Sequence, residues 1–457
     1  MKKLVALTLC LAIILSFAAC EKKQAPSSSA PSSSSQKPSS SEKPSSSKKP
    51  SSLENSSSMP SADKNSSLLS SSVVGPTTSN GTEGPSTEVI SPSVTPPKPV
   101  LPKNYMAYDY LSKSQKEYYD NMLTGIQDMQ TGWIVLGEST KKYRADIALV
   151  RNALLADHPE IFWLPSYYAT AEATSPEGLK TAVVYFAKDA ESPPSYLYSV
   201  AQKERMEGEL AEAVKDIVAS VNKKDAYDIE HELHDILCKT AEYSDDEADP
   251  DIYSAYGALV NKKALCEGYS KAMQLLLKSF SIPAVVVTGE ADGENHMWNM
   301  VYIKEEWYNL DVTWNDMAER ISHEYFNLSD EMISEDHTFH PDFSLLDESI
   351  LASGQTSFNM GKPVSKGTEY NYFNHTGFVF SPDGVFALAD YLAHTEGDFI
   401  EVRFSDKEFR DRVLLDSDSV IQQVNEALAQ KHPKCGFTVG GYSISSMVLR
   451  IYKKLTV

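Results

Sequence analysis

A long stretch near the start of the chain sets the first limit on what can fold. From Glu21 to about Pro97 the sequence consists mainly of Ser, Pro and Lys and has no Phe, Tyr or Trp. Such a segment cannot bury enough apolar surface to offset the entropy lost on ordering, so we expect residues 20–100 to form a disordered tether. Compact structure is therefore expected only from about Leu101 onward, where the chain is long enough for two or three units.

The first residues have the pattern of an export signal. Lys2 and Lys3 precede an apolar run, Leu4–Phe17, that is short for a membrane-spanning helix, and small residues lead on to Cys20. We interpret residues 1–19 as a signal peptide. The ending "AAC" resembles the lipobox of bacterial lipoproteins, which implies cleavage before Cys20 and lipidation of its thiol and new amino group. The expected location is the outer face of the bacterial cell membrane, held by lipid; the alternative is simple cleavage and a soluble product.

The charge balance limits the partners. The formal net charge is −21, although the tether is rich in lysine, so the folded part is more acidic than the tether. An acidic surface argues against nucleic acid and against anionic wall polymers as tightly bound partners. We expect a protein or peptide substrate, wall-associated proteins included, and contact with the membrane only through the N-terminal lipid.

The cysteines do not suggest a disulfide framework. Cys10 would leave with the signal peptide and Cys20 would carry lipid, so three remain, at positions 238, 266 and 435. These are too few and too scattered along the chain for a set of stapling disulfides. We interpret Cys238 as a small buried hydrophobe on a helix and Cys435 as incidental. Cys266 is then the free thiol whose presence in an exported protein has to be explained.

The flanks of the chain predict mixed units. Residues 101–223 contain helical patterns such as "RMEGELAEAVKDIVASV" and a strand, "TAVVYFA", so this region is expected to be mixed α/β. The unit 365–457 alternates expected strands, "GFVFS", "FIEVRFS" and "SSMVLRIYK", with expected helices, "GVFALADYLAHT" and "SVIQQVNEALAQ". This alternation predicts a small C-terminal α/β unit. Between these two units, residues 224–345 contain the candidate catalytic residues.

Cys266 lies where a helix is expected to begin. In "KALCEGYSKAMQLLLKSF" the apolar residues after Cys266 recur at helical spacing, Gly268 marks a turn into the helix, and Pro283 follows its end. A thiol at a helix N-terminus feels the positive end of the helix dipole and unpaired N–H groups, both of which stabilise the nucleophilic thiolate. The same N–H groups can hold the oxyanion formed when a thiolate attacks a carbonyl.

A base and an orienting group follow on expected strands. We expect a strand at Ala284–Thr288, a turn over Gly289–Asn295, and then a hairpin of His296–Ile303 with Trp307–Val312. With Lys304 and Glu305 as a two-residue turn, His296 and Asp311 become diagonal neighbours on one face. Diagonal partners lie about 7–8 Å apart at the backbone, which long side chains can bridge, whereas a one-residue slip separates them.

These three residues carry a resemblance. Cys266 in "ALCEGYSKAMQLLL", His296 in "HMWNMVYI" and Asp311 in "WYNLDVTWND" resemble the core of the transglutaminase-like superfamily, over about Tyr253 to His337. The resemblance implies a papain-like α+β fold in which a helix-borne cysteine meets His and Asp from antiparallel strands. It implies Cys266 as nucleophile, His296 as general base and then acid, and Asp311 as the group that orients the imidazole.

Three aromatic residues complete the expected site. Tyr256, ten residues before Cys266, is a candidate for stabilising the oxyanion. Trp298 and Trp314 are expected to wall the site and exclude water. The "KEE" turn departs from the family, where glycine is common at this position, and this departure bears on the hairpin register rather than on the three residues themselves.

Three functions remain open from the sequence. If water accepts the acyl group, the protein is a peptidase or amidase, which we favour because an exposed extracellular site meets water unless lids exclude it. If a lysine-like amine accepts it, the protein is a cross-linking transglutaminase. The third possibility is a surface lipoprotein that binds other proteins without catalysis.

No cofactor or metal is expected. His231 and His234 lie three residues apart on a helix and precede Asp235, and His337 and His340 repeat that spacing. Histidines at this spacing can share a metal. However, "HELH" lacks the spacing of the "HExxH" zinc-protease signature, and His234-Asp235 falls where the helix before the core should pack, so we expect no metal site here.

Overall fold

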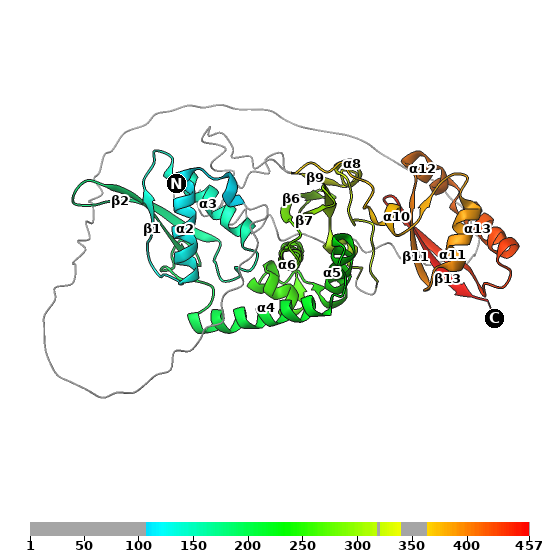
Figure 1. The fold of residues 1–457 in the computed structure, drawn as a ribbon, viewed down its shortest axis with the longest axis horizontal. Helices are drawn as coiled ribbons and strands as arrows, with labels where there is room; N and C mark the ends of the chain where they lie inside the picture. The colour runs from blue at the N-terminus through cyan, green and yellow to red at the C-terminus, as the bar shows by residue number, and fades with distance from the viewer. Residues whose placement is uncertain (1–106, 318–319, 340–362, 457) are drawn as a thin grey trace, which may run out of the picture. The chain divides into compact units, whose positions relative to one another are not determined.

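The computed structural model describes residues 107–317, 320–339 and 363–456, in which helices and strands are mixed along the chain (Figure 1). The fold class is α+β, as predicted. The expected signal peptide, Cys20 and the tether lie outside the described residues, as does His340. Among the described residues, none of the helices has both the length and the apolar character that crossing a membrane requires.

The N-terminal part is an antiparallel sheet packed with helices. β3 lies between β1 and β2 in this sheet, and the strand predicted from "TAVVYFA" is β3. Ser112 starts α2 with a capping box. Its hydroxyl accepts from the Gln115 backbone N–H, and its own backbone N–H donates to the Gln115 side-chain oxygen. The elements are η1 (Ala107–Tyr110), α2 (Lys113–Gln127), β1 (Ile134–Glu138), α3 (Tyr143–Asp157), β2 (Tyr167–Thr174) and β3 (Lys180–Ala187).

The central part places one buried helix against a four-stranded sheet. The strand order is β8-β7-β6-β9, and all its pairs are antiparallel. The helices are α4 (Val200–Ser220), α5 (Ala226–Thr240), α6 (Cys266–Ser279), α7 (Val312–Asn315) and α8 (Asp330–Ile333), with the turns η2 (Pro250–Tyr253) and η3 (Gly257–Asn261). The strands are β4 (Glu242–Tyr243), β5 (Lys263–Ala264), β6 (Ala284–Ala291), β7 (Glu294–Ile303), β8 (Glu306–Leu310) and β9 (His337–Phe339).

The hairpin of β7 and β8 has the predicted register. Ile303 pairs with Glu306 and Asn299 with Leu310, so Lys304 and Glu305 form the turn. Both turn residues have positive φ, 50° and 69°, which is the conformation of the tight turns that favour Gly or Asn. The hairpin therefore keeps a two-residue turn despite its unfavourable residues, and strand pairing fixes the register.

The preceding turn is shorter than predicted. Its expected span was Gly289–Asn295, yet the strands continue to Ala291 and restart at Glu294. Asp292 and Gly293 alone make the turn, both with positive φ. Asp-Gly readily adopts the positive φ values of a two-residue hairpin turn, which explains why the turn is shorter than predicted.

Helix α6 is almost wholly enclosed, because its apolar face joins a core shared with α2, α3, α5 and the sheet. Gly268 lies within the first turn of α6, whereas the sequence predicted a turn leading into the helix there. A Cβ at Gly268 would lie 2.4 Å from the carbonyl oxygen of Ile252, so only glycine allows η2 to approach the start of α6 so closely. This contact brings the segment around η2 beside Cys266.

The C-terminal part is a second sheet with its own core, in the order β10-β11-β13-β12. Helix α12 and strand β12 were not predicted: the first is rich in charge, "KEFRDRVLL", and the second, "FTVGGYSIS", is interrupted by two glycines. The elements are α10 (Tyr372–His375), β10 (Val379–Phe380), α11 (Val385–His394), β11 (Phe399–Phe404), α12 (Lys407–Leu415), α13 (Ser417–Lys431), β12 (Phe437–Ser445) and β13 (Val448–Leu455).

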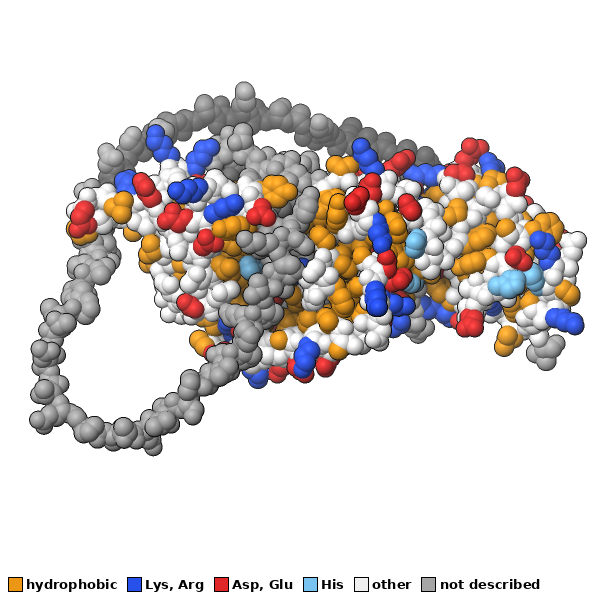
Figure 2. All heavy atoms as spheres, in the orientation of Figure 1, with side chains coloured by type: hydrophobic (Ala, Val, Ile, Leu, Met, Phe, Trp, Pro, Cys, Tyr) orange, Lys and Arg blue, Asp and Glu red, His pale blue; other side chains and the backbone are white. Residues whose placement is uncertain are grey.

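The viewed surface carries charges of both signs. On the face shown in Figure 2, basic and acidic side chains are interspersed, with apolar side chains between them. Among the side chains of described residues on this face, there is therefore no broad basic area of the kind that binds nucleic acid.

Candidate active site

Cys266 is the first residue of α6, where the sequence places it. Its N-cap residue, Leu265, has no side-chain oxygen for the first N–H groups of the helix, which therefore remain oriented toward the start of α6. The Cys266 side chain is 0% exposed. A substrate can reach the sulfur only if neighbouring groups move, which the sequence did not indicate.

His296 and Asp311 meet as the predicted register requires. His296 lies on β7, and Asp311 follows the last residue of β8. The His296 Nε2 atom lies 2.6 Å from Asp311 Oδ2, and both side chains are fully buried. Because Nε2 faces the carboxylate, the other ring nitrogen, Nδ1, is the one left for the cysteine.

Asp311 is satisfied on both carboxylate oxygens. It is the N-cap of α7, where Oδ1 accepts from the Trp314 backbone N–H at 3.1 Å. Oδ2 takes the bond from His296 and a second one from His337 Nε2 at 3.1 Å. β8 therefore ends at Leu310, two residues before the predicted strand end, and Asp311 just after it holds two histidines at once.

His337 also belongs to the site, although its sequence pattern suggested only a metal ligand that we did not expect. It lies on β9, and its Nδ1 is 2.6 Å from Asp336 Oδ1, so both ring nitrogens face carboxylates. β9 pairs with β6, and from there the His337 ring reaches His296 on β7, with centroids 5.6 Å apart. A three-residue strand after an irregular stretch gives no periodic signal, which explains why the sequence did not place it.

The electrostatics of the pair favour opposite charges. Burial alone lowers the pKa of His296, but the Asp311 charge, the hydrogen bond to Asp311, and the hydrogen bond and charge of Cys266 outweigh it and raise the pKa to about 10. Burial raises the pKa of Asp311, yet the charges of and hydrogen bonds from His296 and His337 hold it well below its usual range. The His296 ring therefore interacts with Cys266 and with Asp311, and its protonated form is favoured between these two acidic groups.

The expected oxyanion residue is elsewhere. The Tyr256 hydroxyl donates to Glu209 Oε2 on α4 at 2.6 Å, and the Tyr256 ring packs on Phe162 at 5.2 Å between centroids. The hydroxyl is committed to the α4 side, so the structure does not support Tyr256 in this role. Its position ten residues before Cys266 was a poor guide, because the π-helical turn η3 intervenes.

Tyr253 is better placed. Burial, and then the charges of Glu247, Glu267 and Cys266, raise the pKa of Tyr253 to about 12, so its hydroxyl stays protonated at neutral pH. Among the described residues, this buried hydroxyl has no hydrogen-bond partner. An unpaired donor that feels the charge of Cys266 is suited to an oxygen on a bound substrate.

The two tryptophans lie beside His296. Trp298 is fully buried, its ring stacks on His296 with centroids 6.1 Å apart, and its Nε1–H donates to Asn309 Oδ1 at 3.1 Å. Trp314 is half-buried, with its ring 5.7 Å from His296 and 4.6 Å from His337. Both rings therefore border the His296 imidazole.

The buried histidine pair is a poor metal site. His296, Asp311 and His337 offer three ligand atoms within 4.8 Å of one another. Two ligands on one ion at about 2.0–2.1 Å stand roughly 3 Å apart or more, in octahedral or tetrahedral geometry. The 2.6 Å contact between His296 and Asp311 is shorter than this and fits a charge-assisted hydrogen bond.

The comparison with protein families supports the resemblance seen in the central part of the chain. Residues 215–312 match the model of the transglutaminase-like superfamily, a range that includes Cys266, His296 and Asp311. These residues form a transglutaminase-like domain. The match begins near the end of α4, earlier than the resemblance seen in the sequence. None of the curated proteins compared with the chain matches it.

Solved structures give only distant likenesses to the chain that carries this transglutaminase-like domain. A TGase is 15% identical with a TM-score of 0.22, over 32% of this chain and 44% of that one. A proposed cysteine protease from Cytophaga hutchinsonii is 15% identical with a TM-score of 0.20, over 32% of this chain and 62% of that one. The periplasmic domain of TgpA from Pseudomonas aeruginosa, bound to ethylmercury, is 14% identical with a TM-score of 0.19, over 33% and 66%. The chain spans less than two thirds of the length of the first two.

Proposed function

We propose that Cys266, His296 and Asp311 act as a catalytic triad for thiol acyl transfer on amide bonds of proteins or peptides. The observation that carries the proposal is the 2.6 Å bond from His296 Nε2 to Asp311, with Cys266 interacting with the same ring. A nucleophile, a base and a group that orients the base are the parts that such chemistry needs. The transglutaminase-like match over residues 215–312 supports the same assignment.

The steps follow from the order of the three groups. The Cys266 thiolate attacks the amide carbonyl carbon, and the carbonyl π electrons move to oxygen. As that oxyanion collapses, the carbon–nitrogen bond breaks and His296 gives its proton to the leaving amine. The resulting thioester is attacked by water or an amine, whose proton passes to His296, and collapse releases the product and restores the thiolate–imidazolium pair. Asp311 keeps the ring oriented and stabilises its charge.

Two donors are proposed for the oxyanion. The first is the set of N–H groups at the start of α6, which Leu265 leaves without a side-chain cap. The second is the Tyr253 hydroxyl, which remains protonated and is unpaired among the described residues. Donors fixed before the reaction are worth most where water is excluded, as around the buried Cys266.

We propose hydrolysis rather than cross-linking. An exposed site would favour water as the acceptor, but Cys266 is completely buried, so exposure gives no reason for hydrolysis. A different reason replaces it: once the acyl group occupies the approach to a buried sulfur, water is small enough to follow, whereas a protein-borne amine needs a second approach. Cross-linking by an amine acceptor is the alternative, and a non-catalytic binding protein is the other. We further propose attachment to the outer face of the membrane through a lipid on Cys20.

The acceptor can be read directly from the products. The full chain is incubated with casein and a fluorescent amine, and both new amino termini and incorporated dye are measured. Hydrolysis predicts new amino termini, with dye incorporation at least about 10-fold lower, both lost in Cys266→Ala. Dye incorporation that exceeds cleavage and is lost in Cys266→Ala would show a cross-linking enzyme. Neither signal, with a folded protein, would favour the binding protein.

A further inference from the structure

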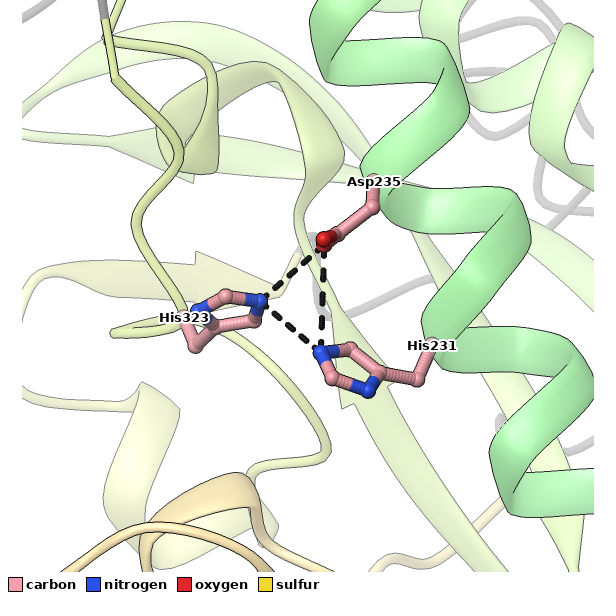
Figure 3. A group of neighbouring side chains, drawn as sticks. All are labelled: His231, Asp235 and His323. Carbon is pink, nitrogen blue, oxygen red and sulfur yellow. Dashed lines mark hydrogen bonds and ion pairs between the residues drawn. The ribbon is translucent and has the colours of Figure 1, made fainter. Parts of the chain in front are cut away.

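A second cluster of ligand-type side chains lies outside the proposed triad. His231 and Asp235 are one turn apart on α5, and His323 faces them from the segment between α7 and α8 (Figure 3). The two Nε2 atoms of the histidines are 3.0 Å apart. Asp235 Oδ1 lies 3.1 Å from His323 Nε2 and 3.8 Å from His231 Nε2.

These separations match those of ligands on one transition-metal ion. Zn²⁺ binds His nitrogen at about 2.0–2.1 Å and carboxylate oxygen at about 2.0–2.2 Å, usually as a tetrahedron, which places ligand atoms roughly 3.3 Å apart. The three distances in the cluster, 3.0, 3.1 and 3.8 Å, bracket that value. The pair at the proposed triad, at 2.6 Å, does not. The cluster thus differs in geometry from the hydrogen-bonded histidines around Asp311.

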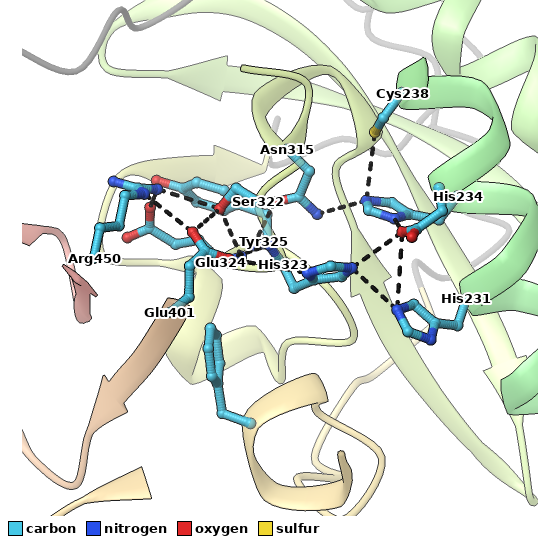
Figure 4. A network of polar contacts seen from close by, with 12 residues as sticks. His231, His234, Cys238, Asn315, Ser322, His323, Glu324, Tyr325, Glu401 and Arg450 are labelled. Carbon is cyan, nitrogen blue, oxygen red and sulfur yellow. Dashed lines mark hydrogen bonds and ion pairs between the residues drawn. The ribbon is translucent and has the colours of Figure 1, made fainter. Parts of the chain in front are cut away.

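Contacts within the protein already fix the position of the His323 ring. Its backbone N–H donates to Glu401 Oε2 at 2.8 Å, and the same oxygen lies 3.9 Å from the ring's Nδ1 (Figure 4). The ring stacks on Tyr372 with centroids 4.0 Å apart and planes at 11°. A carboxylate on the Nδ1 side favours the tautomer whose Nε2 lone pair faces the cluster, which is how metal-bound histidines are commonly oriented.

Glu401 is in turn fixed by a buried ionic network. Arg450 Nε donates to Glu401 Oε1 at 3.0 Å, and Arg450 Nη2 donates to Glu324 Oε2 at 2.6 Å. Ser322 Oγ also donates to Glu401 Oε1 at 2.7 Å. These bonds join the segment before α8 to β11 and β13, so the position of His323 depends on the C-terminal sheet.

The α5 side is held as well. His234 is fully buried and its Nδ1 lies 3.0 Å from Asp235 Oδ1, while its Nε2 faces the Asn315 amide at 3.0 Å. The His231 ring packs edge-on against Phe326 at 5.5 Å. His234 therefore orients Asp235 rather than joining the cluster, which separates the roles of the two histidines that the sequence had grouped together.

We propose that His231 Nε2, His323 Nε2 and Asp235 Oδ1 bind a divalent transition-metal ion of the Zn²⁺ class, with the fourth position open to solvent. The side chains are 27%, 12% and 25% exposed in that order, so an ion can enter from solution. Two imidazoles and one carboxylate are a donor set that such ions accept. The ion would tie α5 to the segment that the C-terminal sheet holds, a stabilising role separate from acyl transfer.

The chain offers a matched control. Asp390, His394 and His432 also gather three such groups, but two of them are exposed. His432 Nε2 lies 2.9 Å from Asp390 Oδ1, and both belong to the C-terminal unit. His394→Phe therefore removes an equivalent side chain from a cluster that lacks the buried support of Glu401 and His234.

Zinc binding to the untagged full chain tests the proposal. All proteins carry Cys266→Ala, so that the thiol cannot hold the ion, and they are dialysed with Zn²⁺ before metal and protein are quantified. We expect one ion per chain and a rise of several degrees in Tm. His231→Phe and His323→Phe keep ring packing but remove Nε2, and they should weaken zinc at least about 100-fold, beyond the 10–100-fold that loss of an outer hydrogen-bond partner costs.

Controls make each outcome decisive. His394→Phe should retain the ion and the rise in Tm. If a phenylalanine variant loses its far-UV circular dichroism, Asp235→Asn serves instead, with the same expected loss of zinc. Absence of a stoichiometric ion in the Cys266→Ala protein, retention of zinc in both folded phenylalanine variants, or its loss in His394→Phe would overturn the proposal. Because the Cys266→Ala background has no proposed nucleophile, none of these results depends on the proposed reaction.

Discussion

Replacing Cys266 by alanine is expected to lower the rate of amide cleavage on the order of 10⁴–10⁶-fold, the loss typical when a triad nucleophile is removed. Alanine keeps the Cβ and leaves only the space of one sulfur atom at the start of α6, where the side chain is fully buried. The fold should therefore persist, and the loss of rate reports on chemistry. The measurement is the initial rate of new amino termini from casein, with far-UV circular dichroism as the test of folding.

Cys435 provides the matched control for this substitution. It is half-buried in the C-terminal unit, and its Sγ donates to the Phe437 carbonyl at 3.3 Å. Cys435→Ala should leave the rate of casein cleavage within about 2-fold of the original, because nothing in the proposed chemistry uses it. Cleavage that survives in Cys266→Ala, or vanishes in Cys435→Ala, would contradict the assignment of the nucleophile.

Asp311→Asn is the second substitution with a large expected effect, on both rate and stability. We expect the rate of casein cleavage to fall by about 10⁴-fold, as when the corresponding Asp of a serine protease triad becomes Asn. The amide keeps the size of the side chain but not its charge, and that charge is the largest influence raising the pKa of His296 against burial. The imidazole would lose the partner that orients it and stabilises its protonated form.

The same substitution should lower the free energy of unfolding by about 3–5 kcal/mol near pH 6, since it leaves one member of a fully buried ion pair alone. The pKa of Asp311 is depressed on folding, so its contribution is present above about pH 3.9 and is lost as pH falls. The pKa of His296 is raised to about 10, so its contribution is complete below about pH 6.5 and is lost as pH rises toward 10. Denaturant unfolding across pH 3–10 should show this difference largest between about pH 4 and 6.5.

Asp157→Asn separates the two effects. Asp157 is also a buried carboxylate, and it accepts from the Tyr119 hydroxyl at 3.0 Å and the Ala107 N–H at 2.6 Å. This variant should lose stability but keep its rate per folded molecule. If Asp311→Asn keeps the original rate, or if Asp157→Asn loses as much rate per folded molecule, Asp311 has no orienting role in the reaction.

The sequence carried enough information to place the three proposed triad residues. A periodic apolar pattern after Cys266 defined α6, and the length of the β7–β8 hairpin put His296 and Asp311 on one face. Both signals come from regular structure, where spacing determines which side chains meet. The Lys304-Glu305 turn did not disturb the register, because paired strands outweigh the preference of two turn residues.

The residues that support the site were harder to find. Tyr253 lies in a short 3₁₀ turn, His337 in a three-residue strand, and His323 outside any helix or strand. Such segments have no period from which a face can be inferred, and contacts from distant parts of the chain place them. Tyr256 was chosen by its distance along the sequence alone, and its hydroxyl instead reached α4. Proximity in sequence is a weak guide where the chain turns irregularly.

The most direct test of the account is the rate at which iodoacetamide alkylates each thiol near pH 6.5, followed by peptide mass spectrometry. A thiolate held beside an imidazolium reacts at a pH where an ordinary thiol is protonated. We predict that Cys266 is alkylated at least about 10-fold faster than Cys238 or Cys435, and that His296→Ala removes this advantage. Equal, slow alkylation of all three cysteines in the folded protein would contradict an activated Cys266, and with it the proposed acyl transfer.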